Sequence, residues 1–390
     1  LGAVVWRTGW DPNSLVFALK SGPSGGRFAH ESFIGGISPW DPPCTATGCQ
    51  LNIGHDHDDA GGFYLYRAGQ WLIPETVVYA DPSTHFHNTI LIDGQGQYRP
   101  PTADFIEDAA DLTYNDASVD HNASTMNFSY VSTEFTERFQ IAGLDSVRRQ
   151  ALFLRPGYLV MVDYLAADRA HAYESRIHFG GDLAFDQGWI RSTLPDEQAI
   201  GVAILNPELM QVTFGYDGFN YASIRPAQLA QEATIATVIL PTFASEWQKR
   251  PQVSIVDDNG DALAIRLDFV DCSECADTLL LRRSAEALGT STVASYEFDG
   301  RAAYIRRSAD GAPESLFISG GTRLIDQGRD QLLFAGTRRT NGLEIDYLGS
   351  LLVLSGDLQA SASLFAPGVE IVVLNGQRVG FVGRRRRGGG

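Results

Sequence analysis

The segment Arg148–Tyr164 reads RRQALFLRPGYLVMVDY and contains the clearest β-hairpin of the sequence. Two apolar runs flank Arg155-Pro156-Gly157, a turn in which proline presets φ and glycine accepts a positive φ. Along the rest of the chain, short apolar or alternating runs bounded by Gly, Asp, Asn and Pro recur, while helical periodicity is scarce. Many short strands without intervening helices predict stacked antiparallel sheets.

We therefore expect an all-β protein, built as a large two-layer antiparallel β-sandwich (a super-sandwich) with a small C-terminal β-sheet domain. The sandwich is expected to span residues 1–325 and the small domain residues 326–383. Residues 384–390 read RRRRGGG. This low-complexity stretch is expected to be a solvated tail without a function of its own.

Composition excludes several classes of protein. The chain has 390 residues and a formal net charge of −17 at pH 7, which argues against nucleic acid as a partner. An acidic polysaccharide would need a locally basic cleft. No apolar run is long enough for a membrane span. The chain begins at Leu1 without an initiator Met or a signal peptide, so we expect a processed product or a fragment. Homo-oligomerisation is left open.

The four cysteines form two close pairs in the sequence, Cys44 with Cys49 and Cys272 with Cys275. Pairs this near to each other are compatible with small local disulfides in an exported protein. A single zinc site made by four thiolates is the alternative, although the short spacing of a zinc knuckle is not present at both pairs. We favour disulfides, and with them a secreted or periplasmic protein.

Histidines cluster in one part of the chain: His55, His57, His85 and His87 lie within 33 residues. Side chains alternate along an extended segment, so each His-x-His pair would present both rings on one face. Imidazole together with a carboxylate such as Glu75 is a normal set of zinc ligands. The alternative is that these are hydrogen-bonded polar residues of surface loops. Two His-x-His pairs around one carboxylate favour a site.

Two motifs in this region resemble the heparinase II/III-like family of polysaccharide lyases. Residues 54–72 read GHDHDDAGGFYLYRAGQWL, and in the family a His-x-His-x-Asp motif is likewise followed by an apolar strand, a glycine turn and a second strand that ends in an acidic residue. Residues 87–94 read HNTILIDG and are similar to the family's His-Asn-Thr segment, which opens the next strand. Both motifs occur in the family's order.

The resemblance implies a metal site and a catalytic residue. The implied ligands of a divalent metal, zinc in a structural role, are His57, Glu75 and His87. The family usually has Asp where Glu75 stands, so this position is a departure from the pattern. His55 matches the family's catalytic histidine. Asp59 matches the acidic position of the first motif and could accept a hydrogen bond from a metal-ligating histidine.

The resemblance also implies an activity, the cleavage of uronic-acid-containing polysaccharide by β-elimination. His55 is the candidate base, or the group that neutralises the sugar carboxylate. Tyr79 and Tyr98 flank the ligand segment and are candidate proton donors. Arg67 and Arg99 are candidates for binding acidic sugar groups. The alternative for each tyrosine and arginine is an ordinary strand or surface residue; His171 and His178 are interpreted as sheet residues.

Family members also have an N-terminal helical toroid that completes the catalytic cleft, and this chain shows no such helical region. The implied partners are therefore an acidic polysaccharide and a separate or cleaved N-terminal helical domain. A different class of function is a non-catalytic carbohydrate-binding or extracellular structural β-sandwich that keeps the metal but works without the toroid. Enzymatic activity is thus left open, and so are the polysaccharide, endo or exo action and the oligomeric state.

Overall fold

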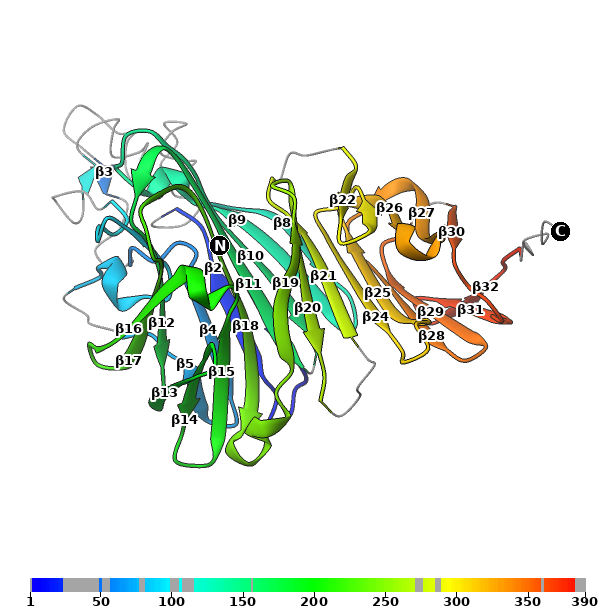
Figure 1. Ribbon diagram of the computed structural model, residues 1–390, viewed down its shortest axis with the longest axis horizontal. Helices are drawn as coiled ribbons and strands as arrows, with labels where there is room; N and C mark the ends of the chain where they lie inside the picture. The colour runs from blue at the N-terminus through cyan, green and yellow to red at the C-terminus, as the bar shows by residue number, and fades with distance from the viewer. Residues whose placement is uncertain are drawn as a thin grey trace. The chain divides into compact units, whose positions relative to one another are not determined.

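The computed structural model describes residues 2–23, 57–76, 81–98, 116–155, 157–270, 276–284, 289–358 and 361–382, and the backbone alone of residues 49–50 and 105–106. Throughout these parts of the chain, strands are joined by turns and short 3-10 helices (Figure 1). These helices are η2 (Thr84–Phe86), η3 (Thr136–Arg138), η4 (Pro207–Leu209), η5 (Ala244–Lys249) and η6 (Gln327–Arg329). None of the described helices has the length and hydrophobicity that a bilayer crossing requires. The predicted all-β, antiparallel sandwich class is confirmed.

The chain folds into two compact units. The first consists of residues 1–122 and 129–250, and the second consists of residues 123–128 and 251–390. The expected boundary between residues 325 and 326 falls inside the second unit, at the end of a strand, and it stays a prediction.

The first unit contains one large and three smaller sheets (Figure 1). The eight-stranded sheet has the order β13 (Asp182–Asp186), β14 (Trp189–Thr193), β15 (Gln198–Ile204), β18 (Ala230–Phe243), β11 (Tyr158–His171), β10 (Leu144–Leu154), β9 (Phe128–Glu134) and β8 (Ser118–Ser124). One four-stranded sheet has the order β1 (Ala3–Arg7), β2 (Val16–Lys20), β4 (Phe63–Arg67) and β5 (Gln70–Ile73). Another has the order β16 (Met210–Tyr216), β17 (Asn220–Pro226), β12 (Tyr173–Phe179) and β6 (Ile90–Ile92). The two-stranded sheet pairs β3 (Cys49–Gln50) with β7 (Phe105–Ile106).

A hydrophobic core of described residues joins the eight-stranded sheet and the two four-stranded sheets. Along β1 and β2, buried and more exposed residues alternate, so each strand contributes one face to the core. Trp6 of β1 and Phe17 of β2 both stack on Phe153 of β10, with ring centroids 6.2 Å and 6.3 Å apart. The four-stranded sheet β1-β2-β4-β5 thereby packs on the eight-stranded sheet. The opposite face of this four-stranded sheet is partly exposed.

The hairpin predicted at 148–164 is confirmed. β10 and β11 pair antiparallel, with Leu154 opposite Tyr158 and Arg148 opposite Tyr164. The amide of Gly157 donates to the carbonyl of Leu154 at 2.9 Å, which closes the turn. His171 and His178 lie in β11 and β12, as expected of sheet residues.

The second unit contains a nine-stranded and a five-stranded sheet around a separate core. The nine-stranded sheet has the order β19 (Gln252–Asp258), β20 (Ala262–Asp268), β21 (Ala276–Arg282), β24 (Ala302–Arg307), β25 (Pro313–Ser319), β28 (Leu343–Leu348), β29 (Leu351–Gly356), β31 (Ile371–Leu374) and β32 (Gln377–Val379). The five-stranded sheet has the order β22 (Ser291–Val293), β23 (Tyr296–Phe298), β26 (Gly321–Asp326), β27 (Gln331–Thr340) and β30 (Ala362–Leu364). The pair of β29 with β31 is parallel.

Asp346 of β28 gives the second unit a dependence of stability on pH. Burial raises the pKa of its carboxyl to about 7; the charge of Glu344 adds to this rise, and a hydrogen bond from Ser315 at 2.6 Å opposes it. A carboxyl with a raised pKa holds its proton in the folded state, so stability is lost as pH rises from about 4 to about 7.

We expect Asp346→Asn to stabilise the protein at pH 8 and to have little effect near pH 4. Because the group is partly exposed, the gain should be only about 1 kcal/mol. Urea unfolding at the two pH values measures it, with Glu314→Gln at an exposed position of β25 as control. A gain of equal size in both variants at pH 8 would contradict the assignment to Asp346.

Candidate metal centre

The side chains of the candidate site lie at one edge of the four-stranded sheet β1-β2-β4-β5. β4 and β5 form a hairpin whose two-residue turn, Ala68-Gly69, has positive φ at both positions (49° and 84°). An antiparallel hairpin places the start of its first strand beside the end of its second. Residues 57–62, which lead into β4, therefore lie near Glu75, which follows β5. His87 reaches the same place from the C-terminal end of η2.

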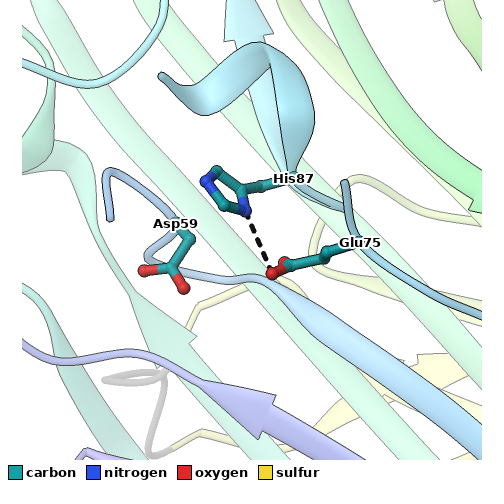
Figure 2. A group of neighbouring side chains, drawn as sticks. All are labelled: Asp59, Glu75 and His87. Carbon is teal, nitrogen blue, oxygen red and sulfur yellow. Dashed lines mark ion pairs between the residues drawn. The ribbon is translucent and has the colours of Figure 1, made fainter. Parts of the chain in front are cut away.

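Asp59, Glu75 and His87 lie close together in this place, and His87 is directed at Glu75 (Figure 2). Each offers one ligand atom, and these atoms all lie within 4.8 Å of one another. His87 Nδ1 is 3.0 Å from Glu75 Oε2, and both side chains are almost completely buried, with 1% and 5% of their surface exposed. Asp59 is buried as well. The three residues could hold a metal ion.

His57 also contacts this group, through the second ring nitrogen of His87. Its Nδ1 is 3.1 Å from His87 Nε2, and the two rings meet edge to face. The three ligands expected from the sequence thus form a chain in which His87 lies between Glu75 and His57. Asp59, expected only to support a ligand, lies among the candidate ligands themselves.

Burial is the largest influence on the pKa of the ionisable groups here. It raises the pKa of Asp59, and Lys20, whose Nζ is 2.6 Å from Asp59 Oδ1, partly offsets this. Burial acts to lower the pKa of His87, but the contact with Glu75 and its charge outweigh burial, and the net shift is upward. Burial and the charge of His87 lower the pKa of His57. The charges of Asp59 and Glu75 act in the opposite direction on the pKa of His57, but they do not outweigh burial and His87.

Two polar atoms of the cluster fit a bound cation. Glu75 Oε1 and His87 Nδ1 are buried and make no hydrogen bond, although His87 Nδ1 lies 3.0 Å from Glu75 Oε2. A buried polar atom without a partner costs about 1–3 kcal/mol. A divalent cation held by imidazole and carboxylate would satisfy both atoms.

The buried side chain of Asn88 holds the loop next to His87 in place. Its Nδ2 donates to the carbonyls of Phe63 and Pro74 at 2.9 Å and 2.6 Å. Its Oδ1 accepts from the backbone amide of His178 at 2.6 Å and lies 3.0 Å from His178 Nδ1. His178 Nε2 in turn lies 3.0 Å from Asp217 Oδ2. His178, expected to be only a sheet residue, therefore also supports the segment that carries His87.

A buried arginine ties the two motifs together. Arg149 of β10 is fully buried and pairs with both carboxylate oxygens of Asp163, at 2.6 Å and 2.9 Å. Its Nη1 donates to the carbonyls of Gly61 and Asn88, at 2.6 Å and 2.8 Å. This role was not predicted from the sequence. A signal was present, because Arg149 is a charged residue in an apolar run and shares a strand face with Val147 and Ala151, which are both fully buried.

The other predicted site residues have different positions. Arg67 ends β4, donates to Gln198 Oε1 at 2.8 Å and to the carbonyl of Thr242 at 2.7 Å, and does not lie in the cluster. Tyr98 lies after β6, and its amide donates to the carbonyl of Arg138. The remaining predictions fall outside the described residues: His55, Tyr79, Arg99, Cys44, Cys272 and Cys275. Of Cys49 only the backbone, in β3, is described. The roles assigned to all of these residues stay predictions.

The fold and the cluster define an all-β sandwich protein with a buried histidine–carboxylate group at the edge of a sheet. The family model described as "Heparinase II/III-like, C-terminal" matches residues 44–268, more than half of the chain. The chain therefore belongs to the heparinase II/III-like, C-terminal family. The resemblance seen in the two motifs is confirmed. No curated protein matches the sequence significantly.

Several solved structures are similar to part of the chain. A heparinase III, the BT4657 gene product, gives a TM-score of 0.52 at 16% identity, covering 72% of this chain and 41% of its own. The heparan sulfate lyase HepC from Pedobacter heparinus gives 0.49 at 17% identity, covering 69% and 40%. A xanthan lyase from Paenibacillus gives 0.40 at 12% identity, covering 90% and 34%. This chain spans less than half the length of each of them.

Proposed function

We propose that the chain is the β-sandwich part of a polysaccharide lyase that cleaves uronic-acid-containing polysaccharide by β-elimination. The observation that carries this proposal is the buried cluster of Asp59, Glu75 and His87, which the two family motifs supply. Family membership supports an acidic polysaccharide as the substrate. A separate or cleaved N-terminal helical domain would complete the cleft, and a secreted or periplasmic location would give access to the polymer.

The reaction requires a base and an acid at the sugar. The base removes the proton on C5 of the uronic acid, the released electron pair forms the C4–C5 double bond, and the C4–O bond breaks. The acid then protonates the leaving oxygen, and no water is consumed. His55 is our candidate base or carboxylate neutraliser, and Tyr79 or Tyr98 is our candidate acid. Arg67 and Arg99 are our candidates for binding the sugar carboxylates, whose negative charge must be offset before C5 becomes acidic.

A divalent metal, which we propose to be zinc, would join the loops that carry the site. Its ligands would come from His57, Glu75, His87 and Asp59, residues that reach one place from three separate segments. A bound divalent cation supplies positive charge and a fixed coordination geometry. The protein residues around it would hold the catalytic segment 55–59 against residues 85–88.

The test is to mix the protein with heparan sulfate, alginate, hyaluronan and ulvan and to follow the ultraviolet absorbance of the unsaturated product. The chain is assayed alone and within its complete natural gene product. We expect product from one of the polymers, and a loss of at least about 100-fold in His55→Ala, since a general base contributes about 10²–10⁴-fold. If neither form makes product but both bind the polymer, the non-catalytic carbohydrate-binding alternative replaces the proposal.

A further inference from the structure

Three aromatic side chains lie together on the outer face of the four-stranded sheet β1-β2-β4-β5. Tyr64 and Tyr66 are two residues apart in β4, so they share the face opposite to the buried Phe63 and Leu65. Trp71 of β5 is paired with Tyr66. Its ring meets the rings of Tyr66 and Tyr64 edge to face, with centroids 5.1 Å and 6.3 Å apart. Half of the surface of Trp71 is exposed.

We propose that this aromatic platform, defined as Tyr64, Tyr66 and Trp71, binds sugar rings of a uronic-acid glycan. The inference rests on the proposed function, from which it takes the class of ligand, and gives a binding role to three rings of the first motif that the resemblance left without one. An exposed aromatic ring offers a flat apolar surface to the C–H face of a pyranose. Three rings held by each other and by the sheet lose little conformational freedom when a ligand binds.

The platform is continuous with the candidate metal centre. The hydroxyl of Tyr64 donates to Glu75 Oε2 at 2.5 Å, the oxygen that also contacts His87. A glycan that lies along Tyr66, Trp71 and Tyr64 therefore runs toward the cluster of Asp59, Glu75 and His87. One glycan molecule could therefore be bound by the platform and cleaved near the cluster.

Beside the rings, the sheet is open. Ala18 of β2 is opposite Tyr64, and Val16 is opposite Tyr66. On β1, Val5 is opposite Ala18, and 63% of its surface is exposed. Short side chains beside large rings leave room for a sugar to lie flat along the sheet.

Charge favours an anionic glycan on this sheet. Strands β1, β2, β4 and β5 read AVVWR, VFALK, FYLYR and QWLI and contain no acidic residue, although the protein as a whole carries a net charge of −17. Arg7 is exposed on the outer face, opposite Val16. Lys20, opposite Ala3, lies at the end nearest the cluster, where its charge is already paired with Asp59. A polyanion would therefore meet less repulsion here than over an average part of this acidic surface.

Binding of polysaccharide by the purified protein tests the proposal without requiring catalysis. Affinity electrophoresis or calorimetry is carried out with heparan sulfate, alginate and hyaluronan, and with dextran as a neutral glycan. We expect the wild type to bind an anionic polymer and Trp71→Ala to weaken this binding about tenfold, with a smaller loss in Tyr66→Phe. The control is Phe185→Ala, which removes a ring of similar exposure (49%) from β13. Circular dichroism and urea unfolding check that each variant is folded.

The outcomes separate this proposal from the proposed function. Weaker binding in Trp71→Ala supports the platform whether or not unsaturated product is formed. Unchanged binding and an unchanged KM in Trp71→Ala would overturn the platform, and the lyase proposal would stand if product is still made. Absence of binding by the wild type to every polymer would also overturn it. So would a wild-type dimer that Trp71→Ala dissociates without a change in glycan binding, because the sheet face would then be a contact between two copies.

Discussion

Replacing His87 with alanine is expected to abolish metal binding. Wild-type protein purified without chelator should carry about one divalent ion per chain, and His87→Ala should carry less than about a tenth of that. The reason is that His87 is in contact with both Glu75 and His57, so its loss removes the residue common to either set of ligands. Elemental analysis of the two proteins measures the effect.

The same substitution should lower stability, since a ligand that binds only the folded state stabilises it by about 2.7 kcal/mol at a hundredfold excess over its Kd. Chelator should lower the melting temperature of the wild type and leave that of His87→Ala unchanged. His171→Ala is the matched control, because His171 is equally buried and contacts the carboxylate of Asp93 at 2.6 Å outside the cluster. Equal metal content in wild type and His87→Ala, or no metal in the wild type even after addition of zinc, contradicts the prediction.

Two further variants determine which residues complete the site. His87 presents Nδ1 toward Glu75 and Nε2 toward His57, and one metal cannot bind both nitrogens of the same ring. If the metal binds on the side of Asp59 and Glu75, Asp59→Asn should lose more metal than His57→Gln. If it binds on the side of His57, the order should be reversed. Replacing Glu75 with Asp, the residue usual in the family, should keep the metal.

Arg149→Met is expected to destabilise the protein by about 3–5 kcal/mol, or to prevent folding. Removing one partner of a buried ion pair leaves the other charge, here that of Asp163, without compensation. Arg149 is fully buried and also donates to the carbonyls of Gly61 and Asn88, so the substitution removes hydrogen bonds from both motif segments. Urea unfolding followed by circular dichroism measures the loss.

Lys249→Met is the control for a cation lost from the first unit. Lys249 and Glu246 are both more than half exposed and 4.0 Å apart, and an exposed pair of this kind contributes about 0–1 kcal/mol. The double variant Arg149→Met/Asp163→Leu should recover part of the stability, since it leaves no unpaired charge in the core. If Arg149→Met is as stable as Lys249→Met, the pair of Arg149 and Asp163 does not hold the two motif segments together.

The sequence predicted the strand content and the main hairpin because those depend on local patterns. The run 148–164 consists of two apolar runs around a turn of proline and glycine, and the structure pairs the two runs as an antiparallel hairpin. The sequence also predicted that Glu75 and His87 lie together, since the motifs place Glu75 at the end of one strand and His87 just before the next. For Asp59 the sequence suggested only the support of a ligand, whereas the structure groups it with Glu75 and His87, because the sequence does not tell which carboxylate of HDHDD faces these two residues.

By itself, the sequence determined the family and the residues that carry its two motifs, because hydrophobic alternation and motif spacing are properties of neighbouring residues. Only the tertiary structure decided that Arg149 and His178 support these motifs and that Asn88 joins their two segments. It also decided that His87 lies between two partners, and that Tyr64, Tyr66 and Trp71 form one surface on the outer face of their sheet. Those contacts join strands far apart in the chain. Their energies depend on burial and on the direction of individual hydrogen bonds, which exist only once the sheets have packed.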